Sequence, residues 1–177
     1  MRKFVALGSL LALVTVPVNA QQTGPIIMAG GGHSPVPNAT FDVPKDLTYK
    51  VVWDISVGAA KPDAKNDRFE VPPRFLNQGA VIGVSRANVE AAVVVHGSAG
   101  EELLTNEEYR ARKGVDNPNI PLLTEMSKAG IRIILCGQTV ASRKMPRDRI
   151  LPFVLVAPSA AWAHAVLQRQ GYTVNPF

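Results

Sequence analysis

The segment "IRIILCG", residues 131–137, constrains the fold more than any other part of the sequence. It is almost entirely apolar and lacks the polar alternation of a strand that has one face in water. Strands of this kind are covered on both faces, which is typical of a parallel sheet enclosed by helices. The segment "VEAAVVVHG", residues 89–97, has the same character. We therefore expect a parallel sheet in an α/β protein.

The rest of the sequence supplies the other elements of such a fold. Three further strand-like segments are "TYKVVWDIS" (48–56), "ILPFVLVAP" (150–158) and "YTVNP" (172–176). Helical patterns lie between the strands, in residues 72–88, 104–114, 117–130 and 159–171. Strands that alternate with helices imply right-handed crossovers. We expect a three-layer α/β/α sandwich with a mainly parallel sheet of about five strands in a flavodoxin-like order.

The expected helices carry signals at their ends. Thr105, Asn119 and Ser159 stand where N-caps are expected. In the last helix, the apolar residues that we expect to face the core are Trp162, Val166 and Leu167.

The N-terminus has the features of a secretory signal peptide. A basic start precedes the apolar run "FVALGSLLALVTV", and "VNA" offers small residues for cleavage after Ala20. An uncleaved anchor is the alternative, although the run is shorter than the about 20 residues of a spanning helix. We expect a signal peptide at residues 1–20, a flexible Gly/Pro-rich lead-in at residues 21–46 and one domain at residues 47–177. The mature protein would then be periplasmic or secreted, with no membrane insertion.

Charge and cysteine content limit the classes of partner. The formal net charge is +5 and falls to about +3 without residues 1–20, which is too mild to indicate nucleic-acid binding. Cys136 is the only cysteine, so the chain has no intramolecular disulfide. In an oxidising compartment a single thiol is unusual. It is buried and inert, joined to another chain, or reactive.

Several candidate site residues follow the expected strands. Ligands bind open α/β sheets outside the carboxyl ends of the strands. That rule selects Cys136 as a candidate nucleophile, together with the pocket residues His96, Gly97, Gly137, Gln138 and Ser159. A thiol at a helix N-terminus favours the thiolate. The alternative is a buried cysteine that only fills space at a strand end.

His96 is a possible proton acceptor for the thiol. In a flavodoxin-like order, however, the first strand separates the second from the third, which puts His96 about 10 Å from Cys136. We therefore expect His96 to orient a loop, to touch a substrate or to be structural. A hydrolase that used "HGSAG" would need a base beside Ser98, and the sequence shows none.

The sequence predicts neither a metal nor a cofactor. His33, His96, His164 and Cys136 lack metal-ligand spacing. We expect His164 to lie at the surface of the last helix or at its boundary.

Over residues 48–177 the sequence resembles the DsrE/DsrF-like family of small sulfur-relay proteins. The resemblance rests on "VVVHG", on "NPNIPLLTEMSKAGIRIILCGQT" and on "VLVAPSAAWAHAVLQRQGYTVNPF". It implies an α/β/α sandwich, commonly assembled into trimers or hexamers. It also implies that Cys136 accepts sulfane sulfur as a persulfide and passes it on. The partners would be a sulfur donor or acceptor protein or a small sulfur compound.

Two hypotheses follow. The first is an exported DsrE-like sulfur carrier, which departs from the family's well-described cytoplasmic relays and so has a different donor and acceptor. The second is a non-catalytic oligomeric binding module in which Cys136 is structural.

Overall fold

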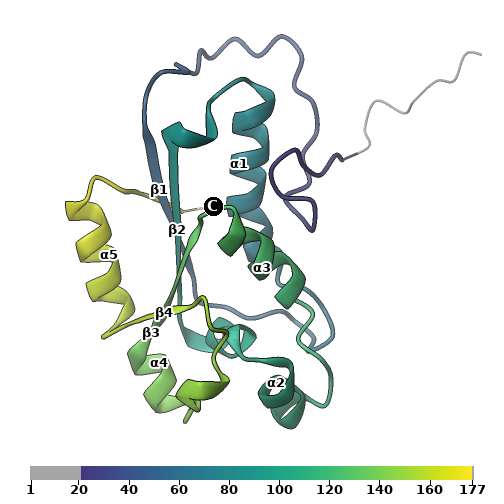
Figure 1. Cartoon of the computed structure of the whole chain (residues 1–177), viewed down its shortest axis with the longest axis vertical. Coiled ribbons are helices and arrows are strands. Elements are labelled where there is room, and N and C mark those ends of the chain that lie inside the picture. The colour runs from purple at the N-terminus through teal and green to yellow at the C-terminus, as the bar shows by residue number, and fades with distance from the viewer. Residues whose placement is uncertain (1–20, 177) are drawn as a thin grey trace, which may run out of the picture.

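The computed structural model describes residues 21–176, which contain a single five-stranded sheet (Figure 1). The expected signal peptide, residues 1–20, lies outside the described residues. In chain order the strands are β1 (Tyr49–Ile55), β2 (Val89–Val95), β3 (Arg132–Cys136), β4 (Leu155–Ala157) and β5 (Thr173–Asn175). Every neighbouring pair of strands is parallel. The expected parallel α/β fold is confirmed.

Helices connect these strands. The α-helices are α1 (Val71–Val81), α2 (Asn106–Lys113), α3 (Ile120–Lys128), α4 (Gly137–Ser142) and α5 (Ala160–Arg169). Short 3-10 helices are η1 (Asp67–Glu70), η2 (Arg86–Asn88), η3 (Gly97–Leu103) and η4 (Arg147–Arg149). Between residues 21 and 176, no helix combines the length and the hydrophobicity needed to cross a bilayer.

The strand order is β4-β3-β2-β1-β5, which differs from the flavodoxin-like order assumed from the sequence. Successive strands from β1 to β4 lie side by side, and only β5 returns to the other edge, beside β1. Local patterns define strands but not their neighbours, because strand order depends on contacts between distant segments. In the observed order no strand separates β2 from β3.

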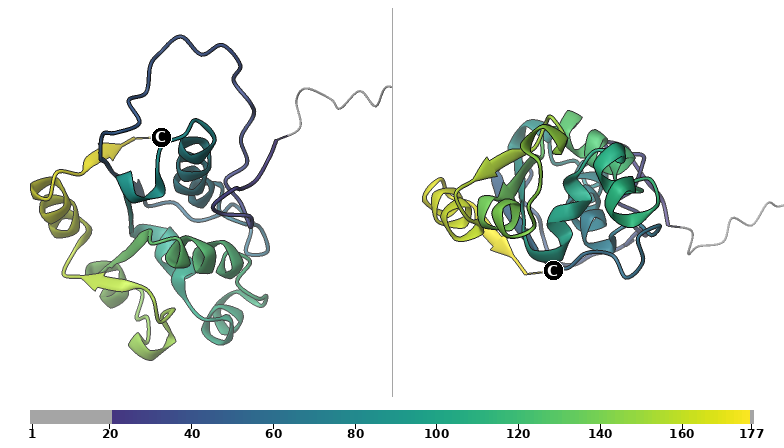
Figure 2. Two further views of the ribbon diagram at one scale, coloured as in Figure 1. Left: turned by 45° about the horizontal axis from the view of Figure 1, so that its top comes forward. Right: turned by 90° about the horizontal axis from the view of Figure 1, so that it is seen from below.

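The strand order also explains the layers. The connections from β1 through β3 step in one direction, and their helices α1 and α3 pack on one face. The connection from β4 to β5 runs back across the sheet. A right-handed crossover in that direction must cover the opposite face, where α5 lies. Figure 2 shows α5 on one side of the sheet and α1 and α3 on the opposite side.

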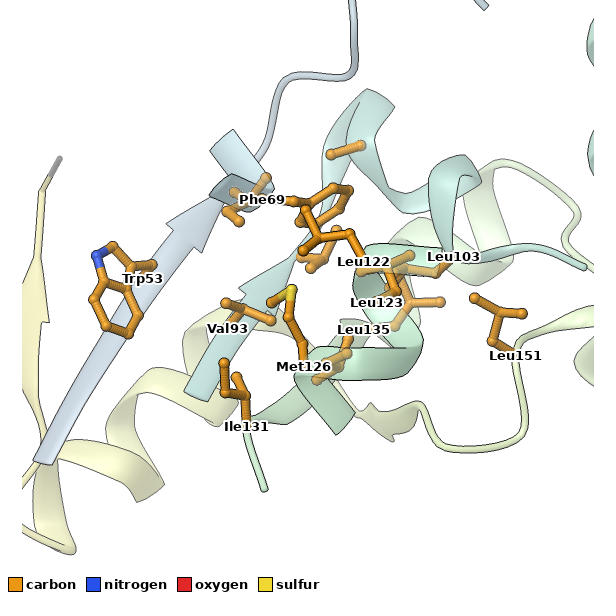
Figure 3. Close-up of a cluster of buried hydrophobic side chains, with 14 of the residues drawn as sticks. Trp53, Phe69, Val93, Leu103, Leu122, Leu123, Met126, Ile131, Leu135 and Leu151 are labelled. Atoms are coloured by element: carbon orange, nitrogen blue, oxygen red, sulfur yellow. The ribbon is translucent and has the colours of Figure 1, made fainter. Parts of the chain in front are cut away.

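The larger core lies between the sheet and the α1–α3 layer. Val93 of β2 and Leu135 of β3 are fully buried there against Leu122 and Met126 of α3 (Figure 3). These side chains alternate along their strands with those that face α5. This packing fixes which face of each strand is turned toward α5.

The expected buried face of α5 is correct only for Leu167, which is 2 % exposed. Trp162 and Val166 are 66 % and 50 % exposed. The reason is that α5 is the one helix on its face of the sheet in the described residues, so nothing covers the side of α5 above β3 and β4. An apolar cavity of about 360 Å³ lies there, and Leu155 and Pro158 also line it.

Part of the expected flexible lead-in packs against the domain. Ile27 is fully buried, and its backbone N–H donates to the side-chain oxygen of Asn77 in α1 at 2.9 Å. The backbone N–H groups of Met28 and Ala29 donate to the carboxylate of Glu125 at 2.7 and 2.9 Å. Residues 27–29 of this segment therefore pack against the domain through hydrogen bonds to side chains of α1 and α3.

Of the three expected N-cap residues, only Ser159 makes a side-chain hydrogen bond that caps its helix. The Ser159 hydroxyl oxygen accepts from the N–H of Trp162 at 3.2 Å and caps α5. Thr105 and Asn119 make no side-chain cap. The Asn119 side-chain oxygen accepts instead from the backbone N–H of Asn66 at 2.8 Å, in a buried network that takes precedence over capping.

Candidate functional site

Cys136 lies where the chain changes from one face of the sheet to the other. The chain leaves β3 into α4, whose Val140 belongs to the core on the α1–α3 face. It leaves β4 into α5 on the opposite face. Cys136 pairs with Ala157 at the ends of these two strands, so it lies between the two diverging connections. Such a switch point is the place where α/β sheets bind ligands.

Hydrogen-bond donors surround the sulfur of Cys136. It accepts from the backbone N–H groups of Gln138 and Thr139 in α4, from that of Ala160 in α5, and from the Thr139 hydroxyl. Burial raises the pKa of the thiol, but these hydrogen bonds outweigh it and the net pKa lies below the ordinary value. The structure therefore favours the thiolate in a residue that is only 6 % exposed.

Two glycines bring the loops close together at this point. Gly97 has a φ of +57°, and a Cβ there would lie 2.5 Å from the carbonyl oxygen of Ser56. A Cβ at Gly137 would lie 2.6 Å from the carbonyl oxygen of Ala157. The N–H of Gly97 donates to the Thr139 hydroxyl at 3.1 Å. This hydroxyl therefore joins the loop after β2 to the thiol.

Gln138 and Ser159 hold the two connections in place. The Gln138 side-chain amide donates to the carbonyl oxygen of Pro158 at 3.4 Å, which ties α4 to the end of β4. Ser159 caps α5 and so fixes the helix whose first N–H, that of Ala160, reaches the sulfur. Both residues lie beside Cys136, and both make hydrogen bonds within the chain.

His96 is closer to Cys136 than the sequence predicted, because β2 and β3 are neighbours. Val95 pairs with Leu135, so His96 and Cys136 follow at the next position of the same register. Adjacent strands are about 4.8 Å apart, and the expected separation of two strand spacings is wrong. The backbone N–H of His96 donates to the carbonyl oxygen of Ile55 at 2.9 Å, which keeps His96 in an extended conformation.

The carboxylate of Asp54 accepts hydrogen bonds from two histidines, His96 and His164. His96 Nε2 lies 3.0 Å from Asp54 Oδ2, and His164 Nε2 lies 2.7 Å from Oδ1. Burial raises the pKa of Asp54, but the hydrogen bonds and charges of the two histidines lower it below its ordinary value. Asp54 is therefore an anionic acceptor for both imidazole rings.

Sequence reasoning missed Asp54, Thr139 and the role of His164. Asp54 is the acidic residue that interrupts the apolar run "VVWDI", residues 51–55, and this polar interruption was the available signal. His164, expected at the surface or at a boundary of α5, has a side chain only 18 % exposed because it faces Asp54. No set of three or more His, Cys, Asp or Glu residues between residues 21 and 176 is arranged to hold a metal ion.

Together these features define an α/β sandwich protein with a thiol at its topological switch point. The model of the DsrE/DsrF-like family matches residues 76–176, more than half of the chain, and the protein belongs to this family. The resemblance inferred from sequence motifs is confirmed.

One solved structure is similar to the fold as a whole. It is a protein of unknown function, MTH1491 from Methanobacterium thermoautotrophicum, which superposes with a TM-score of 0.51 at 19 % identity. The similarity covers 73 % of this chain and 99 % of that one. No curated protein sequence matches the chain.

Proposed function

We propose that this protein carries sulfane sulfur as a persulfide on Cys136 after export to the periplasm or the exterior. The observation that carries the proposal is the set of hydrogen bonds to the Cys136 sulfur, which lowers the pKa of the thiol. A thiolate is the form that attacks sulfur. Membership of the DsrE/DsrF-like family supports a role in sulfur relay.

The chemical step is an exchange between two sulfur–sulfur bonds. The Cys136 thiolate attacks the outer sulfur of a donor persulfide, R–S–SH, and forms Cys136–S–SH. The bond between the two sulfur atoms of the donor breaks, and the donor leaves as the thiolate R–S⁻. No oxidant or reductant is consumed. Transfer to an acceptor thiolate repeats the step in the other direction.

A structural role for Cys136 is the competing function. Its small exposed fraction of 6 % favours this alternative, because a sulfur carrier needs access to its partner. The neighbouring apolar cavity supports the carrier role, because Ala157, the partner of Cys136 in the sheet, lines it. A donor that enters this cavity approaches the sulfur from the α5 side.

A homo-oligomer, such as a trimer or hexamer, is part of the proposal. The exposed apolar side chains of Leu155, Trp162 and Val166 support it, since apolar patches of this kind are typical of interfaces. A second copy on this patch would cover the open side of α5 and would form one wall of the cavity.

Intact-mass analysis tests the carrier function directly. The protein is incubated with glutathione persulfide, and its mass is compared with that of Cys136→Ser under the same conditions. The proposal expects a gain of one sulfur atom in the wild type that is absent from the variant and is reversed by a reducing thiol. If the folded wild type gains no sulfur, Cys136 is a structural residue.

A further inference from the structure

The His96, Asp54 and His164 cluster lies next to Cys136 but is not needed for the hydrogen bonds that stabilise the thiolate. Asp54 of β1 and Val94 of β2 are partners in the sheet, and Val94 faces the α5 layer. Alternation along β2 turns His96 to the same face. His164 on α5 meets Asp54 from the other side. The cluster therefore occupies the α5 face at the carboxyl end of the sheet.

The hydrogen bonds assign the protons of both imidazole rings. A carboxylate only accepts, so Nε2 of His96 and Nε2 of His164 both carry hydrogen. The second nitrogen of His96, Nδ1, is then the one that exchanges a proton. His96 keeps 32 % of its side chain exposed, whereas the Nδ1 atom of His164 is buried without a hydrogen-bond partner. His96 is thus placed to meet a ligand, and His164 is placed to hold Asp54.

The first two turns of α5 connect this cluster to the thiol. Ala160 donates its backbone N–H to the Cys136 sulfur, and His164, one turn later, donates to Asp54. Residues four apart lie on the same side of a helix. One helix face therefore contacts both the sulfur and the carboxylate, and His96 lies between them in register with Cys136.

We propose that His96 carries the proton in sulfur transfer at Cys136, and that Asp54 and His164 are positioning residues that orient it. This inference rests on the proposed carrier function. The Cys136 thiolate attacks the outer sulfur of R–S–SH. As the sulfur–sulfur bond of the donor breaks, the imidazolium form of His96 gives its Nδ1 proton to the leaving sulfur. The products are Cys136–S–SH and R–SH, so atoms and charge balance.

Two reagents separate the proton transfer from the reactivity of the thiol. Iodoacetamide alkylates Cys136 and releases iodide, a leaving group that needs no proton. A sulfane donor releases a thiolate, and this leaving group is stabilised when it takes up a proton. Single-turnover rates for both reagents are measured by intact mass from pH 5 to pH 9, in the wild type and in His96→Gln, Asp54→Asn and His164→Phe. The titratable groups that face this site are Cys136 of β3, His96 after β2, Asp54 of β1 and His164 of α5.

The control is Glu90→Gln at the opposite end of β2. Glu90 is as exposed as Asp54, with 44 % against 41 % of the side chain, and it pairs with Lys50 rather than with the cluster. Glu90→Gln is expected to react as the wild type does. His164→Gln is the rescue variant, because its amide retains a donor for Asp54, and it is expected to restore the rate of sulfur transfer that His164→Phe loses.

General acid–base catalysis contributes about 100-fold or more. We expect sulfur transfer to slow at least tenfold in Asp54→Asn and His96→Gln and to lose its pH dependence near neutrality, while alkylation stays within about twofold of the wild type. Equal slowing of both reactions, or unchanged transfer in both variants, would overturn the proton role while leaving the carrier function intact. A wild type that is alkylated but takes up no sulfur would instead remove the carrier function, and the inference with it.

Discussion

Replacement of Thr139 by valine is the sharpest test of how the site lowers the pKa of Cys136. The Thr139 hydroxyl accepts from the N–H of Gly97 at 3.1 Å and donates to the Cys136 sulfur. Valine keeps the shape of the side chain and replaces the hydroxyl with a methyl group. A hydrogen bond to a charged group contributes about 1.5 kcal/mol or more. Its loss lowers the ratio of thiolate to thiol roughly tenfold.

The valine substitution also affects stability, because the N–H of Gly97 loses its acceptor. An unpaired donor costs about 1–3 kcal/mol, and the lower end applies because Gly97 is only partly buried. Urea unfolding measures this loss. Thr139→Ser is the matched control, since it keeps the hydroxyl and removes one methyl group, which is worth about 1 kcal/mol.

Iodoacetamide alkylation across pH separates the two effects. At neutral pH the Thr139→Val protein should react about tenfold more slowly than the wild type, because less of its thiol is ionised. At alkaline pH the rates should converge, because both thiols are then fully ionised. A Thr139→Val protein that reacts at the wild-type rate at neutral pH, or a Thr139→Ser protein as slow as the valine variant, would refute this account of the thiolate.

Three further predictions follow from the structure. The folded-state pKa of Cys136 is lowered, so its contribution to stability is present above the pKa of the unfolded thiol and is lost as pH falls through the folded value. Urea unfolding should therefore show that the gap between wild type and Cys136→Ser widens as the pH rises toward the pKa of the unfolded thiol, about 8.5. Asn77→Ala should cost about 2 kcal/mol and speed hydrogen exchange at Ile26 and Ile27, which donate to its side chain. Trp162→Asp should lower the mass of the assembly in light scattering if the exposed face of α5 is an interface.

The sequence predicted the strands and the cysteine position because both depend on local patterns. The apolar runs of β2 and β3 are buried on both faces, as expected of a parallel sheet. The strand order depends instead on which strands meet after the chain has crossed the sheet. The resulting error placed His96 too far from Cys136 and hid the possibility that the two residues act together.

The same limitation explains why the histidine cluster was missed. Asp54 and His164 are 110 residues apart, and no sequence spacing relates them. Their contact exists because the β4-to-β5 connection returns across the sheet and lays α5 on its face, where His164 reaches Asp54 of β1. Sequence reasoning assigned Trp162 and Val166 to the buried face of α5 by hydrophobicity alone. In the structure His164 faces the edge of the sheet because it donates a hydrogen bond to the Asp54 carboxylate there.

The position of α5 determines the chemistry of the whole site. Its first N–H reaches the sulfur of Cys136, and its second turn holds Asp54 through His164. Only two buried residues, Ala163 and Leu167, anchor the helix to the sheet. A helix with so small a buried face shifts more easily than one packed on both sides. A second copy on its exposed side would hold α5 in place, so assembly and thiol reactivity would be coupled through this one helix.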